Sequence, residues 1–267
     1  MSKLIVSLPY PSLAGNGNTS YQYVLSNDAR NRENSGFASL SELPKADATV
    51  LVVPARALSW HQVDLPKVPK ARLRAALDGL LEERLLDDTN ALALALSPEA
   101  RTGKAATAAW VAACDKAWLT TAVKVFDAAG CRITQVVPEF WPREDVQIVV
   151  SGTPEEAWIT RSDAQGVMTI PLRAGDTTGA LGALLADFPA ETPILAEPAV
   201  VALAESSLSH KIELRQHAQG QLQSATSLWE LAQFDQSLSG DSQGMKSVIR
   251  QWQNFWQLPA WRPARWG

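Results

Sequence analysis

The stretch VQIVVSGTPEEAWITRSDAQGVMTIPLR, residues 146–173, holds three apolar and β-branched runs separated by short polar connections. Such runs, bounded by Gly, Pro, Asp and Ser, are typical of β-strands, and SDAQG (162–166) is typical of a hairpin loop. Further along, the patterns predict a helix at 177–188, a strand at 192–198, a helix at 199–206 and a strand at 211–217. Three strands followed by helix, strand, helix and strand is the order of a ribonuclease-H-like layer.

The amino-terminal third repeats part of this pattern. KLIVSLP (3–9) and SYQYVLS (20–26) predict two strands, and ATVLVVPA (48–55) is a continuous β-branched run closed by Pro54. We expect these strands to form another ribonuclease-H-like layer, which later segments complete. The predicted fold class is therefore mixed α/β, with two ribonuclease-H-like layers arranged in an actin-like fold and a small α/β subdomain inserted.

The insertion has its own strands and helices. ALSWHQVDLP (57–66) alternates as a strand does, and PKARLRAALDGLLEERLLDD (69–88) predicts a helix beginning at Pro69. Helical spacing places five leucines on one stripe of it: Leu73, Leu77, Leu80, Leu81 and Leu85. A strand at 106–114, a helix at 115–130 capped by Asp115 and Gly130, and a strand at 131–138 follow.

We therefore predict four parts. Residues 1–55 belong to the first ribonuclease-H-like subdomain, 56–140 to the inserted subdomain, 141–245 to the second ribonuclease-H-like subdomain, and 246–267 to a C-terminal helix and juxtamembrane tail. Residues 220–245 are rich in Gln, Ser and Gly, so we expect them to be loosely ordered.

Composition narrows the function classes. The 267 residues carry a formal net charge of −4 with a pI of about 5.5, so no overall basic field favours nucleic acid as a partner. Cys114 and Cys131 lie outside any CxxC motif or Cys/His cluster, which argues against zinc and against a disulfide framework. We expect both to be small core residues in a reducing compartment. The start lacks the pattern of a signal peptide, and no run approaches the roughly 18 apolar residues of a membrane span.

An actin-type or sugar-kinase-type ATPase would need glycine-rich turns that aim backbone N–H groups at phosphates, and acidic residues for a metal. The hairpin at 7–22 has two prolines and no acidic residue before Asp28. The next hairpin, 149–158, offers Gly152 and Thr153 without a glycine cluster, and Asp176 fits a helix cap better than a metal ligand. We interpret the nucleotide site as degenerate and expect no cofactor.

The other titratable residues do not indicate catalysis either. His61, His210 and His217 form no metal-ligand pair, so we expect surface or strand-end positions for them. No GxSxG motif marks a nucleophile. A cluster of four carboxylates lacks the spacing of a calcium loop and fits a solvated helix end or a charged partner contact: Glu82, Glu83, Asp87 and Asp88. We predict no catalytic, cofactor-binding or metal-binding residue.

LPKVPKARLRAALDGLLEERLLDDTNALALAL (65–96) resembles the segment typical of the cytoplasmic domain of the type II secretion system protein L family, GspL. The matching positions are Leu65, Pro66, Arg72, Arg74, Ala76, Leu77, Leu81, Glu82, Glu83, Leu85, Asp87 and Asp88. Residues 43–66, 108–139 and WELAQFD (229–235) resemble further family segments in consistent order. The chain departs from the family at Asp78 and Gly79, where Pro-Tyr is usual.

The resemblance implies an actin-like fold without ATPase activity. It implies a non-enzymatic platform protein that holds the N-terminal domain of the secretion ATPase (GspE) at the cytoplasmic face of the bacterial inner membrane. A transmembrane helix and a periplasmic domain pairing with protein M (GspM) would follow, and a homodimer is a further partner state. The alternatives are a nucleotide-binding enzyme using Gly152, Thr153 and Asp176, and an actin-like scaffold of a pilus or division system.

Two surfaces are candidates for the partner. One is the acidic patch formed by the four carboxylates above, because charge complementarity steers association; the other is the exposed edge of the hairpins at 145–173, by strand addition. In the tail QWQNFWQLPAWRPARWG (251–267), tryptophans and arginines alternate as they do next to a membrane span. We expect four membrane-proximal residues there: Trp261, Arg262, Arg265 and Trp266.

Overall fold

The structure is a computed structural model that describes residues 1–11, 19–27, 34–101, 108–175, 179–189 and 191–233. The expectations for Asp176 and for the C-terminal tail with Trp261, Arg262, Arg265 and Trp266 lie outside the described residues.

The first sheet has five strands in the order β3-β2-β1-β4-β8. Their bounds are β1 Lys3–Ser7, β2 Ser20–Ser26, β3 Asn34–Ser39, β4 Ala48–Val53 and β8 Ile133–Pro138. The first three strands form antiparallel pairs, whereas β4 runs parallel to both β1 and β8. All six residues of β4 are buried, as the continuous β-branched run predicts for a strand covered on both faces.

The second sheet repeats the same strand order, β11-β10-β9-β12-β13. Its strands are β9 Gln147–Gly152, β10 Ala157–Asp163, β11 Gly166–Leu172, β12 Ile194–Ala196 and β13 Ile212–Leu214. The helices α4 (Gly179–Leu185) and α5 (Val201–Ser207) supply apolar side chains to its core. Because order and strand directions match those of the first sheet, both sheets have the arrangement predicted for a ribonuclease-H-like layer.

The third sheet is small and antiparallel, in the order β5-β7-β6. It consists of β5 Ser59–Asp64, β6 Leu92–Leu96 and β7 Ala108–Asp115, with the short helix α2 (Pro98–Arg101) after β6. Helix α1 (Lys70–Leu81) packs on one face through Leu77 and Leu81. Helix α3 (Lys116–Ala128) lies between the other face and the first sheet, in a core shared by both sheets.

The caps predicted for α3 are confirmed. The Asp115 side chain accepts a hydrogen bond from the Trp118 N–H at 2.7 Å, and so satisfies one free donor of the first turn. Gly130 has a φ of +79°, the left-handed conformation that ends a helix at little cost for glycine alone.

One of the helix predictions above was wrong in its extent, and two strands were not predicted. The helix predicted for 69–88 ends at Leu81, because acidic residues follow, and negative charge is unfavourable at a helix C-terminus. Strand β3 was missed, since NSGFAS has few strand-forming residues. Strand β6 was missed as well, since LALAL has the composition of a helix.

The expectation that residues 220–245 are loosely ordered was wrong for the described part. Helix α6 spans His217–Ala225 and packs on β1, β2, β4 and β8 of the first sheet. Its apolar stripe is short, formed by Ala218, Leu222 and Ala225, which the surrounding Gln and Ser residues obscure in the sequence. The first layer thus contains elements that precede the second layer in the chain and one that follows it. The division into four parts remains a prediction.

After α6 comes a segment of residues 227–233, which we call the C-terminal strap. The Leu231 N–H donates to the Val136 carbonyl of β8 at 2.8 Å. The Gln233 carboxamide pairs with both backbone groups of Leu96 in β6, and the ring of Trp229 lies edge-on to Trp60, 4.9 Å between centroids. The strap therefore covers an edge strand of the first sheet and one of the third.

Candidate functional site

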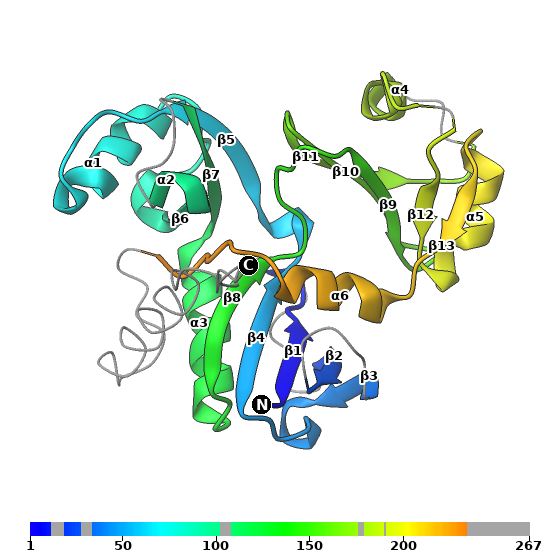
Figure 1. The fold of residues 1–267 in the computed structure, drawn as a ribbon, viewed down its shortest axis with the longest axis horizontal. Helices are drawn as coiled ribbons and strands as arrows, with labels where there is room; N and C mark the ends of the chain where they lie inside the picture. The colour runs from blue at the N-terminus through cyan, green and yellow to red at the C-terminus, as the bar shows by residue number, and fades with distance from the viewer. Residues whose placement is uncertain (12–18, 28–33, 102–107, 176–178, 190, 234–267) are drawn as a thin grey trace, which may run out of the picture.

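The carboxyl ends of β1, β8, β12 and β13 meet next to α6, between the two five-stranded sheets (Figure 1). In open α/β sheets, ligands bind outside the carboxyl ends of the strands. Polar side chains gather there, and we call the group the strand-end joint: Ser7, Glu139, Glu197, Arg215, His217 and Gln221. Four of them end a strand or directly follow one, and the other two lie on α6.

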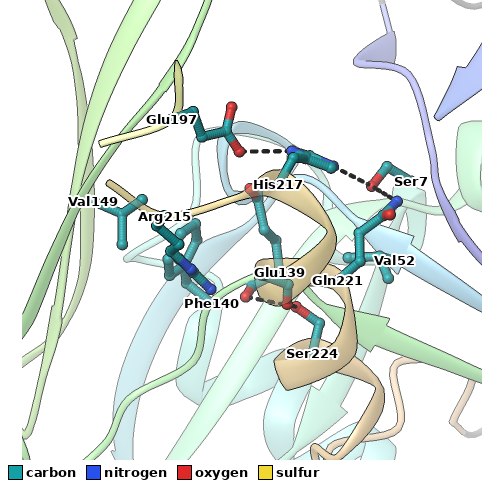
Figure 2. A pocket seen from close by; sticks show the side chains of 11 residues that line it. Ser7, Val52, Glu139, Phe140, Val149, Glu197, Arg215, His217, Gln221 and Ser224 are labelled. Carbon is teal, nitrogen blue, oxygen red and sulfur yellow. Dashed lines mark hydrogen bonds and ion pairs between the residues drawn. The ribbon is translucent and has the colours of Figure 1, made fainter. Parts of the chain in front are cut away.

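A chain of hydrogen bonds crosses the joint from the second sheet to the first (Figure 2). His217 Nδ1 lies 2.6 Å from Glu197 Oε1; because a carboxylate can only accept, Nδ1 is the donor. His217 Nε2 lies 3.5 Å from Ser7 Oγ. The Gln221 amide donates to Ser7 Oγ at 2.7 Å and to the Gln22 carbonyl at 3.1 Å. Two adjacent turns of α6 therefore form hydrogen bonds to both sheets: His217 to the second, and His217 and Gln221 to the first.

Two charged groups lie deeper in the joint. Glu139 retains some exposed surface, but its carboxyl group points inward. Desolvation there raises the pKa of Glu139, and the hydrogen bond that the carboxylate accepts from the Ala55 N–H at 3.0 Å acts in the opposite direction. Burial also lowers the pKa of Arg215, while Glu139 and Glu197 oppose that shift. The guanidinium donates to Gln223 Oε1 at 2.8 Å. These opposite charges stabilise one another in a site with little free space.

The joint is nearly filled by these side chains. The space that they leave is about 10 Å³, roughly the room of one water molecule. Sites for small molecules and cofactors measure about 300–1,000 Å³. In this arrangement the joint has no room for a nucleotide.

The glycine hairpin between β9 and β10 is also engaged within the chain. Gly152 has a φ of +108°, and a Cβ at this position would lie 2.3 Å from the Glu156 carbonyl oxygen, so the turn requires glycine. The Gly152 N–H donates to Glu197 Oε2 over a long 3.4 Å. A backbone donor that could face a phosphate therefore faces a carboxylate of the same chain.

An arginine ties this hairpin to the segment after β4. Arg56 pairs with Glu156 at 2.6 Å. Its guanidinium also lies 4.4 Å from the ring centre of Trp158 and 4.8 Å from that of Tyr10. Stacking of a cation between two aromatic rings adds to the ion pair, so the two sheets are connected at a second place beside the joint.

The predicted acidic patch lies far along the chain from the joint, in the turn after α1. Glu82, Glu83 and Asp87 are exposed there, and none of them forms an ion pair within the described ranges. The Asp88 side chain accepts from the Asn90 N–H at 2.8 Å and caps the 3₁₀ turn Thr89–Ala91. Leu86, which directly precedes Asp87 in the sequence, is fully exposed.

The histidine prediction was wrong for one residue of three. His61 bonds Ser59 near the surface and His210 packs on Phe188, but His217 is central to the joint. Within residues 1–233 as described, no group of three or more His, Cys, Asp or Glu is placed to hold a metal ion. Cys114 is buried and Cys131 partly buried, as expected of core residues.

Sequence reasoning missed three charged members of the joint. Glu139, Glu197 and Arg215 each directly follow an apolar strand, in VVPE, ILAE and IELR. A charge placed at the end of a buried parallel strand is the signal that could have found them, because such ends gather at one edge of a sheet.

Two layers of identical strand order, joined at their strand ends, define a two-lobed actin-like α/β protein. Among solved structures, the cytoplasmic domain of EpsL, an inner-membrane component of the type II secretion system of Vibrio cholerae, matches with a TM-score of 0.62 at 19% identity, over 89% of this chain and all of that one. The PilM–PilN type IV pilus biogenesis complex matches with a TM-score of 0.52 at 12% identity, over 80% of this chain and 88% of the other. A Bacteroides thetaiotaomicron protein described as having an actin-like ATPase fold gives 0.41 at 9% identity, covering 83% and 95%.

The family profile of type II secretion system protein L matches residues 20–228. The chain therefore belongs to the type II secretion system protein L family, which confirms the predicted family and fold class. Comparison with curated protein sequences finds no match. In the part of the chain that the structure describes, no helix is long and apolar enough to cross a membrane.

Proposed function

We propose that this domain is a non-enzymatic platform that recruits the secretion ATPase, GspE, through the N-terminal domain of that ATPase. Family membership makes the chain a component of the type II secretion system. The observation that supports a scaffold over an enzyme is the filled strand-end joint, where about 10 Å³ remain between the two sheets. The platform would lie at the cytoplasmic face of the inner membrane, with GspM and a second copy as further partners of the full-length protein.

We propose the acidic turn after α1 as the ATPase contact. Exposed carboxylates precede and follow a fully exposed leucine, Leu86, in the sequence, so the turn offers an apolar side chain between charged ones. The leucine supplies apolar contact area while the carboxylates steer a basic partner. The other candidate, the outer hairpin edge, belongs to β11, and the start of that strand lies against Trp110 of β7, which leaves less of it free for strand addition.

The test is binding of the purified N-terminal domain of the cognate ATPase, measured by calorimetry. The variant Glu82→Lys/Glu83→Lys/Asp87→Lys reverses the patch and leaves the capping residue Asp88 in place. We expect at least a tenfold weaker affinity. The matched control makes the same change in net charge at exposed sites elsewhere: Asp127→Lys, Glu191→Lys and Glu205→Lys. Equal affinity of the patch variant and the wild type would refute this contact, and no association of the wild type at micromolar concentration would refute the recruitment.

The enzyme alternative has its own measurement. Calorimetry with ATP and magnesium should give no heat of binding for the wild type, given the size of the joint. Binding that is abolished by Asp176→Ala would revive that alternative. Gly152→Val is less informative, since its side chain would clash with the Glu156 carbonyl whatever the function.

A further inference from the structure

We propose that the Glu197 carboxylate is a built-in anion, which occupies a small-oxyanion site at the strand-end joint and keeps the two sheets together without a ligand. The proposal concerns the conformation of this domain and does not depend on which partner binds it.

The groups near Glu197 are of the kinds that bind oxyanions in proteins. One carboxylate oxygen accepts from His217, in the first turn of α6, at 2.6 Å, and the other accepts from the Gly152 N–H at 3.4 Å. The N-terminus of α6 carries a partial positive charge that favours an anion. The Arg215 guanidinium is near enough that the charge of Glu197 raises the pKa of Arg215, against the lowering by burial. Backbone N–H, imidazole, helix terminus and guanidinium are the donors that bind oxyanions in proteins.

The position of the carboxylate explains why its charge matters to the whole fold. Gly152 ends β9, and Glu197 directly follows β12, so both belong to the second layer. His217 belongs to α6, which packs on the first sheet. The carboxylate is therefore the anionic group through which the second layer binds a helix of the first.

A second observation is that one buried acceptor at the same cavity lacks a partner. The Gln221 side chain is 2% exposed, and its Oε1 has no hydrogen-bond partner, while its amide nitrogen bonds Ser7 and Gln22. Gln221 lines the same small cavity as Glu197 and His217. Removal of the Glu197 carboxylate would enlarge this cavity and leave two donors unpaired, the His217 Nδ1–H and the Gly152 N–H, which is the condition for binding a small anion from solution.

The experiment is rescue of Glu197→Ala by anions. We expect the thermal midpoint of Glu197→Ala to fall by about 3–10 °C, as for loss of a charge-assisted hydrogen bond in a domain of this size. Sodium phosphate or sodium acetate in the millimolar range should restore part of that loss in a saturable way. The wild type and the exposed control Glu205→Ala should respond no more than to sodium chloride of equal ionic strength. An unchanged midpoint in Glu197→Ala, a loss that neither anion restores, or an equal response of all three proteins would overturn the proposal.

Glu197→Gln provides a second test if Glu197→Ala does not fold, with or without the added anions. The amide removes the charge, keeps the size of the side chain and keeps one acceptor oxygen, which can serve either His217 or Gly152, so this variant should fold. Amide hydrogen exchange of Gly152 and of the first turn of α6 should then be at least about tenfold faster than in the wild type, the factor for roughly 1.4 kcal/mol of local opening free energy. Unchanged exchange would overturn the proposal. None of these outcomes depends on ATPase binding, so a failure here is distinguishable from a failure of the proposed function.

Discussion

Replacing Gln233 by glutamate tests whether the C-terminal strap closes the edge of the third sheet. The Gln233 carboxamide acts as a peptide group would: it accepts from the Leu96 N–H at 3.1 Å and donates to the Leu96 carbonyl at 3.0 Å. It also donates to the Glu230 carbonyl at 2.7 Å. Glutamate keeps the acceptor and loses both donors, and it places a carboxylate against two carbonyl oxygens.

The magnitude follows from the two lost donor bonds. An unsatisfied buried acceptor costs about 1–3 kcal/mol. Leu96 is almost fully buried, whereas Gln233 is only partly so, and water can replace part of the loss. We therefore expect Gln233→Glu to lower the free energy of unfolding by about 2–4 kcal/mol at neutral pH. The loss should shrink in acid, where the protonated carboxyl can donate once more.

Urea unfolding of the domain measures this change, and amide exchange of Leu96 localises it. Gln165→Glu is the matched control, because it adds the same charge to an exposed side chain in the hairpin loop between β10 and β11. A loss within about 0.5 kcal/mol of that control, the range of ordinary surface substitutions, would refute the bridging role of the strap.

Two further predictions concern buried titratable groups. Burial raises the pKa of Glu139 above 4.5, so the folded state holds that proton more tightly than the unfolded chain, and stability falls as pH rises from 4.5 through the raised pKa. Glu139→Gln keeps an acceptor for the Ala55 N–H and should flatten this pH dependence in thermal unfolding; a variant with the same pH profile as the wild type would contradict the prediction. Burial and the Asp115 charge raise the pKa of Cys114 to about 12, so a disulfide reagent at about pH 8 should modify Cys131 alone until urea unfolds the domain. Labelling of Cys114 at the rate of Cys131 would show that the core opens.

The elements predicted correctly are those whose signals lie within a few residues of one another. The β10–β11 hairpin has its turn in SDAQG, where the Gln165 N–H donates to Asp163 Oδ1 at 2.7 Å and Gly166 takes a φ of +129°. Helix α3 has both caps in sequence. By contrast, α6 is stabilised by packing on β-branched residues of the first sheet, such as Val24 and Val50. These residues lie about 170 or more positions earlier in the chain, so the local composition of α6 does not predict the helix.

The strand-end joint could not be assembled from the sequence for a related reason. Ser7 and His217 are 210 residues apart, and Glu197 reaches His217 only because the two layers face each other. Each residue alone has the pattern of an ordinary strand end or loop. The sequence shows that the hairpins at 7–22 and 149–158 lack the glycine clusters and acidic residues of a phosphate site. Only the structure shows that the Glu197 carboxylate lies against Gly152.

The order of the elements along the chain determines which parts of the domain connect a bound partner to its C-terminal segment. The first layer receives β8 only after the insertion, and α6 only after the whole second layer. The described chain then ends in a strap that bonds β8 through Leu231 and β6 through Gln233. A pull on the chain beyond Gln233 would therefore act first on the first and third sheets, and would reach the second layer through the contacts between them, among which are the strand-end joint and the hairpin held by Arg56. The acidic turn proposed as the ATPase contact directly follows α1, and α1 packs on β6, to which the strap is bonded, so these packed elements connect the proposed contact to the strap without the second layer.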